Sequence, residues 1–137
     1  MPLAEEQSAR HPSGAPRLLI VDDEERICQV LERFFTFKGY EVRTVRGGEE
    51  AVALASAFHP HVVLLDLLMP GMNGLETFKA LKQQLHPPPK VLMLSAADQE
   101  EVVKGALELG IDFYLCKPVD FRQLEHLVNG YYPAKKP

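Results

Sequence analysis

Short apolar runs alternate with helix-like segments along most of the chain, and this order constrains the fold more than any other feature. Four of the five runs are apolar nearly throughout, which is typical of strands covered on both faces of a parallel sheet. The run at 41–45, Glu-Val-Arg-Thr-Val, alternates polar and apolar residues and is expected at a sheet edge with one wet face. The five expected strands are 18–21, 41–45, 62–65, 91–94 and 113–116.

The segments between these runs carry apolar residues at helical spacing. Three of them begin with Asn or Asp followed three residues later by Glu or Gln, a pair able to form a reciprocal cap. These pairs are Asn73 with Glu76, Asp98 with Glu101 and Asp120 with Gln123. Gly39 and Gly110 are expected to end the first and fourth helices. The apolar positions expected in the four clearest helices are Ile27, Val30, Leu31, Phe34, Phe35; Ala51, Leu54, Ala55, Phe58; Leu75, Phe78, Leu81, Leu85; and Phe121, Leu124, Val128.

This strict alternation predicts an α/β fold, a doubly wound parallel sheet with helices on both faces. Right-handed crossovers leave few topologies, and five strands favour the flavodoxin-like order 2-1-3-4-5. The 137 residues suffice for one domain and are too few for two ordinary ones. We therefore predict one domain over 17–131, a flexible tail at 1–16, and a second tail or the start of a linker at 132–137.

Composition excludes several classes of protein. Fifteen basic and 19 acidic residues give a net charge of -4, so the domain has no general attraction to nucleic acid phosphates. No apolar run approaches the ~20 residues that span a bilayer, and the N-terminus lacks a signal-peptide stretch. The two cysteines, Cys28 and Cys116, are too few for a disulfide framework or a zinc cluster and are expected to be small buried residues, with a redox role beside Lys117 left open. We expect a cytoplasmic domain without membrane insertion or direct nucleic acid binding.

Polar side chains gather where the expected strands end. Asp22 and Asp23 follow the first strand and Asp66 follows the third, so half of the six aspartates stand at strand ends. Ser95 follows the fourth strand and Lys117 the fifth. Because ligands of such sheets bind beyond the carboxyl ends of the strands, these five side chains define the candidate site.

The electrostatics of this group indicate its chemistry. Two carboxylates ~4 Å apart repel by ~4 kcal/mol at an effective dielectric near 20, so three together require a cation or a proton. An all-oxygen site with open positions favours Mg²⁺, with Mn²⁺ as the alternative. A divalent cation together with Lys117 would exceed the charge of the cluster unless an anion joined it, and a phosphoryl group completes the balance. An aspartate can itself act as the nucleophile and form an aspartyl phosphate.

Five motifs in order give the chain a specific resemblance. It resembles a response-regulator receiver domain, the phosphoacceptor module of two-component signalling, from about residue 17 to residue 131. The intervals are 44 residues from Asp22 to Asp66, 29 from Asp66 to Ser95 and 22 from Ser95 to Lys117. The motifs are Leu19-Ile20-Val21-Asp22-Asp23-Glu24, Val63-Leu64-Leu65-Asp66, Met69-Pro70-Gly71-Met72-Asn73-Gly74, Leu94-Ser95-Ala96 and Tyr114-Leu115-Cys116-Lys117-Pro118.

The resemblance implies a role for each site residue. Asp66 is expected to be phosphorylated, and Lys117 to pair with the phosphoryl oxygens. Ser95 and Tyr114 are the expected switch residues, which change the surface of the fourth helix, fifth strand and fifth helix. The expected metal ligands are Asp22, Asp23, Asp66 and the backbone carbonyl of Leu68. The Lys117–Pro118 bond is expected to be cis.

The resemblance also implies partners. A sensor histidine kinase or phosphotransfer protein would donate the phosphoryl group, and an output domain or downstream protein would respond. A homodimer through the fourth helix, fifth strand and fifth helix is a further expectation. The chain is not expected to be an enzyme beyond its own phosphorylation and dephosphorylation. The sequence does not identify the kinase, the output or the oligomeric state.

Several alternatives stay open at this point. Asp22 and Asp23 can instead cap the first helix, and Ser95 the fourth. A hydrolase acting through an aspartyl phosphate would need a second acid where Leu68 stands. A flavodoxin-like cofactor site would bring phosphate against the acidic run that begins at Asp22. The remaining alternative is a receiver-like scaffold without phospho-switching.

Two positions depart from the usual receiver pattern. The apolar Leu68 is expected to influence the lifetime of the phosphate, and Ser95 replaces the commoner Thr while keeping the hydroxyl.

Overall fold

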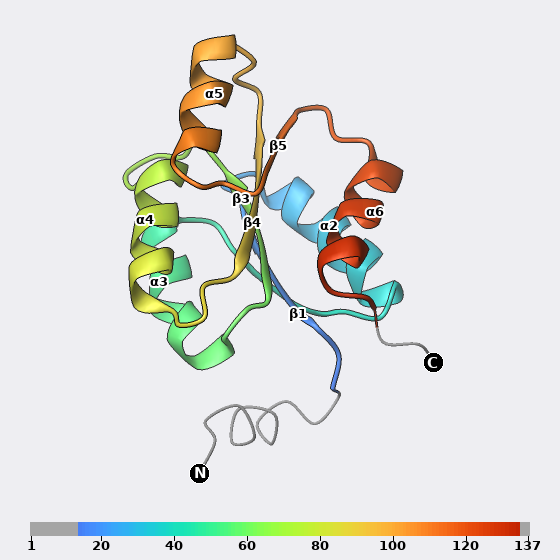
Figure 1. Cartoon of the computed structure of the whole chain (residues 1–137). Helices are drawn as coiled ribbons and strands as arrows, with labels where there is room; N and C mark the ends of the chain where they lie inside the picture. The colour runs from blue at the N-terminus through green and yellow to red at the C-terminus, as the bar shows by residue number, and fades with distance from the viewer. Residues whose placement is uncertain (1–13, 135–137) are drawn as a thin grey trace.

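A computed structural model describes residues 14–134, so most of the predicted N-terminal tail and the last three residues of the C-terminal one lie outside the described residues. Five strands and five helices alternate along the chain (Figure 1). The strands are β1 (Arg17–Val21), β2 (Glu41–Val45), β3 (Val62–Asp66), β4 (Lys90–Ser95) and β5 (Phe113–Cys116). The helices are α2 (Glu25–Phe37), α3 (Gly48–Phe58), α4 (Gly74–Gln84), α5 (Glu100–Glu108) and α6 (Phe121–Tyr131).

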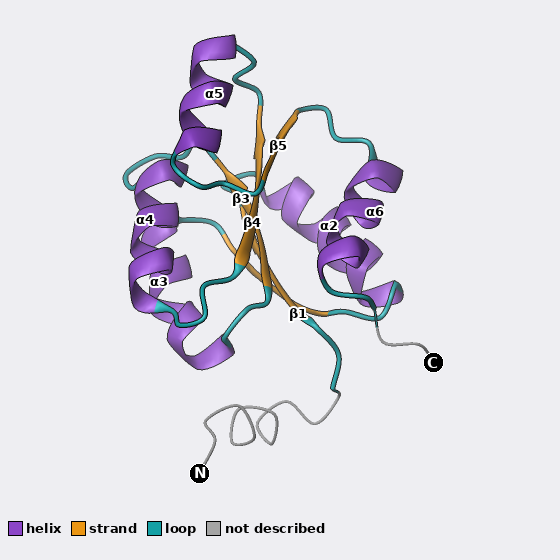
Figure 2. Ribbon diagram, in the orientation of Figure 1, coloured by secondary structure: helices purple, strands orange, loops and turns teal. Residues whose placement is uncertain are grey.

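The five strands form one parallel sheet in the order β2-β1-β3-β4-β5. Figure 2 shows the strands in orange, between the two groups of helices. The predicted fold class and strand order are confirmed, and β2 is an edge strand as its alternating pattern predicted. The order reverses at β1, between β2 and β3, and this switch places the ends of β1 and β3 side by side. Asp66 at the end of β3 is paired with Leu94 of β4, immediately before Ser95.

Helices cover both faces of the sheet, with α3, α4 and α5 on one side and α2 and α6 on the other (Figure 1). Leu19 and Val21 of β1 face the first layer, while Leu18 and Ile20 face the second. All four are at most 1% exposed, because a central parallel strand is covered from both sides. Continuous apolar runs in β1, β3 and β4 therefore supply two separate cores.

Most predicted helix ends agree with the structure. Asn73 and Glu76 form the reciprocal cap of α4, and Asp120 accepts bonds from the first backbone amides of α6. Gly39 and Gly110 lie in the left-handed region, with φ angles of 104° and 107°, just beyond the ends of α2 and α5.

Three predictions about these elements were wrong. Asp98 does not begin the fourth helix, because α5 starts two residues later, behind Gln99, without a side-chain cap. Phe121 is only half-buried, although Leu124 and Val128 of the same helix are fully buried. Cys116 is exposed rather than buried. The reason is that β5 is the other edge of the sheet, so its apolar run is not covered on both faces.

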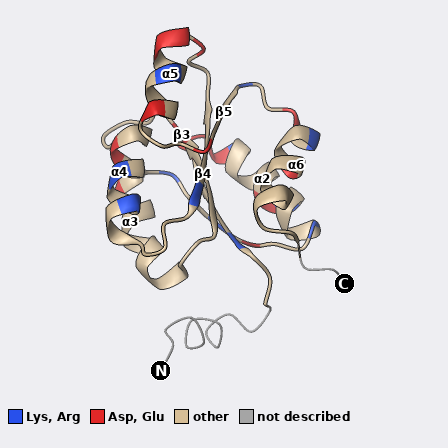
Figure 3. Ribbon diagram, viewed as in Figure 1, with Lys and Arg blue, Asp and Glu red and all other residues tan. Residues whose placement is uncertain are grey.

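Both signs of charge are distributed over the two helix layers (Figure 3). Acidic and basic side chains occur together on α2 and α6 and again on α4 and α5. Within residues 14–134, none of the helices combines the length and the apolar character that crossing a lipid bilayer requires.

Candidate functional site

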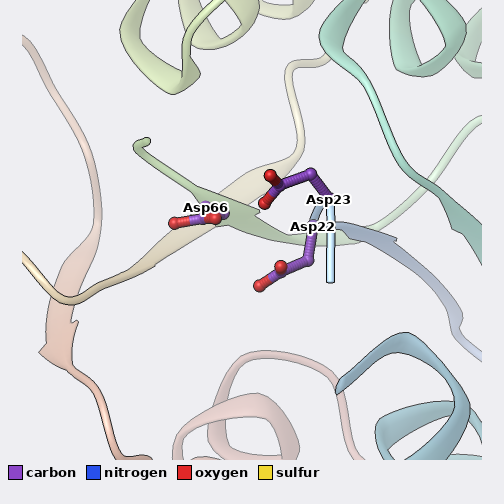
Figure 4. A group of neighbouring side chains, drawn as sticks. All are labelled: Asp22, Asp23 and Asp66. Atoms are coloured by element: carbon purple, nitrogen blue, oxygen red, sulfur yellow. The ribbon is translucent and has the colours of Figure 1, made fainter. Parts of the chain in front are cut away.

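Three carboxylates converge where β1 and β3 end. Asp22 and Asp23 directly follow β1 and Asp66 is the last residue of β3, and each offers an oxygen within 4.8 Å of the other two (Figure 4). Asp22 and Asp66 are buried, with 2% and 4% of their surfaces exposed, while Asp23 is exposed. The cluster is therefore open to solvent on the Asp23 side and enclosed by protein on the others.

Lys117 brings a positive charge into this cluster from the loop after β5. Its Nζ lies 2.8 Å from Oδ2 of Asp22 and 3.6 Å from Oδ2 of Asp66. The Lys117 side chain is 14% exposed, so its charge is only weakly screened by water. The Lys117–Pro118 bond is cis, as expected.

Glu24 is a site residue to which the sequence reasoning gave no role. Its Oε1 lies 3.2 Å from Lys117 Nζ, and its side chain is 59% exposed. The signal was present in the acidic run of four residues, Asp22 to Glu25, after the first strand. Glu24 also occupies the N-cap position of α2 without making a side-chain cap bond. Asp22 accepts a hydrogen bond from the Glu24 amide at 2.9 Å, outside the helix, so helix capping does not account for Asp22 and Asp23.

Ser95 and Tyr114 meet at a common neighbour, Ala97. The Ser95 hydroxyl accepts a hydrogen bond from the Ala97 amide at 3.1 Å, and the Tyr114 hydroxyl donates to the Ala97 carbonyl at 2.6 Å. Ser95 is fully buried at the end of β4 and Tyr114 is half-buried on β5. Because α5 begins only at Glu100, Ser95 does not cap that helix. The link through Ala97 is made by its main chain, which leaves no trace in the sequence.

Burial and crowding change how the site holds protons. Burial, followed by repulsion from Asp22, raises the pKa of Asp66 to about 6, against the opposing effects of Lys117 and of the Leu68 amide. Burial alone would lower the pKa of Lys117, but its hydrogen bonds and attraction to Asp22, Asp66 and Glu24 outweigh burial and raise it. Burial also raises the pKa of Tyr114, against the opposing effect of a side-chain hydrogen bond with Ser95. A cation added to the cluster would lower the pKa of Asp66 again.

The loop after β3 completes the surroundings of Asp66. The Leu68 amide donates a hydrogen bond to Oδ1 of Asp66 at 3.3 Å, while the Leu68 side chain is 57% exposed. No acid stands at this position, so the loop provides no second carboxylate for a hydrolase.

The donor set fits a hard divalent cation. Two buried carboxylates and one exposed carboxylate supply only oxygen, and the open side at Asp23 leaves room for water ligands, as Mg²⁺ prefers. A single lysine does not neutralise three aspartates and Glu24, so the cluster retains negative charge toward a cation. The structure thus brings together four of the predicted side chains, Asp22, Asp23, Asp66 and Lys117, and places Ser95 on the strand beside Asp66.

Comparison with known proteins identifies the family. The sequence model of the response regulator receiver domain family matches residues 18–129 of the chain. The alkaline phosphatase synthesis transcriptional regulatory protein PhoP of Bacillus subtilis is 40% identical over 114 residues, which cover 83% of this chain and 47% of PhoP. The chain thus spans about half the length of this relative.

Solved structures agree with this match. The receiver domain of the Francisella response regulator 1452 superposes with a TM-score of 0.79 at 32% identity, covering 85% of this chain and 96% of that one. Chemotaxis protein CheY4 of Vibrio cholerae gives a TM-score of 0.78 at 29% identity, with coverages of 85% and 98%. The CheX-CheY-BeF3-Mg+2 complex of Borrelia burgdorferi also gives 0.78 at 29% identity, with coverages of 85% and 89%. The chain belongs to the response regulator receiver domain family, the receiver module of two-component systems.

Proposed function

We propose that this receiver domain is a phosphorylation switch in which Asp66 accepts a phosphoryl group. The observation that supports this most strongly is the convergence of Asp22, Asp23 and Asp66 within 4.8 Å, with the Lys117 ammonium 3.6 Å from the Asp66 carboxylate. Three acids and one lysine at the carboxyl end of a parallel sheet match the needs of phosphoryl transfer to a carboxylate.

Asp66 is the nucleophile in this proposal. One carboxylate oxygen forms a bond to phosphorus as the bond between phosphorus and the donor breaks, and the donor leaves with that electron pair. The negative charge on the phosphoryl oxygens then faces Lys117, whose ammonium needs no proton transfer to stabilise it. Ser95 accepts a hydrogen bond from the Ala97 amide and its side chain also bonds Tyr114, so in this proposal its hydroxyl turns from Tyr114 to donate to a phosphoryl oxygen.

Asp22, Asp23 and Asp66, together with the main-chain carbonyl of Leu68, are the proposed ligands of Mg²⁺. When bound, the ion neutralises charge on the transferring group and holds the oxygen ligands together. Asp22 also bonds Lys117 at 2.8 Å, which keeps that ammonium beside the acceptor. Mn²⁺ has the same preference for oxygen ligands and is the proposed substitute.

The proposed output is a change in the surface formed by α5, β5 and α6. Ser95 and Tyr114 are the switch residues, and both are bonded to Ala97 in the loop that leads into α5. A phosphoryl group that attracts the Ser95 hydroxyl therefore acts on the same loop that Tyr114 holds. Leu107 and Leu109 at the end of α5 are 45% and 41% exposed, which provides apolar contact area for a partner.

The proposed partners follow from the same arrangement. A histidine kinase or phosphotransfer protein supplies the phosphoryl group in the cytoplasm, and an output domain or downstream protein reads the switched surface. A homodimer through α5, β5 and α6 is one form of that output. Chemistry at the site is limited to the gain and loss of the phosphoryl group on Asp66.

The proposal is tested by incubating the full chain with Mg²⁺ and acetyl phosphate and recording its intact mass. The wild-type protein is expected to gain the mass of one phosphoryl group. Asp66→Asn and an excess of chelator are each expected to prevent the gain. Asp98→Asn is the matched control, because Asp98 is an exposed aspartate that is not one of the three clustered carboxylates, and this variant is expected to gain the same mass as wild type.

Two results would contradict the proposal. An undiminished mass gain in Asp66→Asn would place the modification elsewhere. No gain in the wild-type protein, with Mg²⁺ binding established separately and with a panel of phosphodonors, would favour a receiver-like scaffold without switching.

A further inference from the structure

Helix α4 begins directly against the main chain of Asp66, and Gly74 makes the contact. A Cβ atom on Gly74 would lie 2.7 Å from the Cα of Leu67, and closer still to the carbonyl oxygen of Asp66. Real Cβ atoms essentially never approach another heavy atom within 3.0 Å. Gly74 is not among the glycines with positive φ, so a glycine is needed here for space rather than for backbone conformation.

Neither side of this contact yields easily. The Gly74 amide donates to the Leu67 carbonyl at 2.9 Å, which ties the start of α4 to the residue after Asp66. The first turn of α4 is held by the Asn73 cap, by the bond of the Thr77 hydroxyl to the Asn73 carbonyl at 2.8 Å and by complete burial of Thr77. A side chain at position 74 would therefore force the start of α4 and the Asp66–Leu67 main chain apart, and the Asp66 carboxylate moves with that main chain.

We propose that Gly74 is a positioning residue for the acceptor, an inference that rests on the proposed function. By allowing α4 to close on the main chain of Asp66 and Leu67, it sets the distance of the Asp66 carboxylate from Asp22 and Asp23. Asp22 and Asp23 follow β1 and are not among the residues that Gly74 contacts. A shift of Asp66 alone therefore changes the distances between the three carboxylates. Metal binding and phosphoryl transfer both depend on those separations.

The test compares Mg²⁺ affinity and the rate of phosphorylation by acetyl phosphate in wild type and Gly74→Ala. Both quantities are measured under conditions in which circular dichroism shows that the variant is folded. The rate is measured at saturating Mg²⁺. We expect the affinity for Mg²⁺ and the saturated rate each to fall by at least about tenfold, since a misplacement of ~1 Å can cost about a hundredfold in rate.

Two variants separate positioning from general loss of stability. In Val128→Ala a fully buried side chain of α6 is shortened in the core on the other face of the sheet, so the fold loses stability while the contact between α4 and Asp66 is not touched. In Gly105→Ala the new Cβ meets nothing within 4 Å. Both variants are expected to keep the wild-type affinity and rate to within about twofold.

The outcomes distinguish this inference from the proposed function. Wild-type values in Gly74→Ala overturn the inference, and so do equal losses in Val128→Ala. If the wild-type protein takes no phosphoryl group, the proposed function fails, and the Mg²⁺ affinities of the same variants still decide the role of Gly74.

A measurement on the wild-type protein applies even if Gly74→Ala does not fold. Binding of Mg²⁺ should tighten the contact between α4 and the Asp66–Leu67 main chain, because Asp66 becomes a fixed ligand. The Gly74 amide, bonded to Leu67, is then expected to exchange its hydrogen at least about threefold more slowly with Mg²⁺, while the Gly105 amide keeps its rate. An unchanged exchange rate at Gly74 contradicts the positioning role.

Discussion

Asp66 carries a free-energy cost in the metal-free protein because it is buried beside another acid. Its pKa of about 6 lies above the ordinary value of 3.8, so the folded protein holds a proton that the unfolded chain has already released. Between these two values the folded state binds more protons, and stability falls as the pH rises. This destabilisation is complete above the pKa of Asp66 in the folded protein, and it disappears below the pKa of Asp66 in the unfolded chain.

Asp66→Asn is therefore expected to stabilise the metal-free protein at neutral pH. Relative to the variant, the wild type should lose on the order of 1 to 3 kcal/mol of unfolding free energy as the pH rises from about 4 to about 7. Urea unfolding of both proteins in chelator, at several pH values, measures this difference. A difference that stays constant across this range, or that grows toward acid, contradicts the raised pKa.

Lys117 stabilises the metal-free fold, whereas the ionised Asp66 destabilises it, because the Lys117 ammonium lies among these acids. In Lys117→Gln, Asp22 loses its 2.8 Å partner while remaining 2% exposed. We expect the metal-free variant to lose about 2 kcal/mol at neutral pH, and Mg²⁺ to restore part of that loss by supplying another cation. Thermal unfolding with and without Mg²⁺ checks this. Lys38→Gln is the control, because the Lys38–Glu125 pair is 3.5 Å apart with 35% and 36% of its side chains exposed, and such pairs contribute little.

The residues of the site were predictable to the extent that their positions follow strand ends. Asp22, Asp23, Asp66 and Lys117 all belong to that group. Ala97 and Gly74 were not assigned a site role, because the first acts through its main chain and the second through the absence of a Cβ atom. Contacts of these two kinds depend on tertiary packing, which a single sequence does not display.

At the scale of elements, the two predicted caps of α4 and α5 differ in the structure and give a paired test. Asn73 accepts a bond from the Glu76 amide at 2.9 Å, whereas Asp98 stands before the N-cap of α5. Asn73→Ala is expected to cost about 1 kcal/mol of unfolding free energy, and Asp98→Ala less than about 0.5 kcal/mol. Chemical denaturation measures both. Equal losses in the two variants would show that the pattern alone, and not the cap geometry, governs these helix starts.

The elements themselves were largely predictable, and the errors have a common cause. Central strands such as β1 and β3 are covered on both faces, so their composition reports their position directly. At the edge, β5 has a similar apolar composition but leaves Cys116 exposed. Phe121, at the start of α6, is likewise only partly covered. Composition predicted the kind of element, whereas exposure at edges and ends depended on which neighbours the fold supplied.

For the molecule as a whole, the doubly wound sheet brings together charges that are far apart in the sequence. Asp22 and Lys117 are separated by 95 residues, yet their side chains are in contact. Repulsion within the cluster opposes folding, and a bound cation relieves it. Mg²⁺ is therefore expected to stabilise the fold, by about 1.4 kcal/mol at a concentration ten times the dissociation constant.

Stability against Mg²⁺ concentration is readily measured by thermal unfolding. The increase should disappear in Asp23→Asn combined with Asp66→Asn, because two of the three carboxylates are then neutral, and should persist in Asp98→Asn. Equal stabilisation of all three proteins would mean that Mg²⁺ acts elsewhere on the molecule.

The central claim is that Asp66 is the residue that carries the phosphoryl group, and chemical trapping tests it most directly. An acyl phosphate is reduced by borohydride to the alcohol, so a phosphorylated aspartate becomes homoserine, which peptide mass spectrometry locates. After incubation of the full chain with acetyl phosphate and Mg²⁺, we predict homoserine at position 66, and none when chelator replaces the metal. Homoserine at Asp22, Asp23 or another aspartate, with position 66 unchanged, would contradict the account.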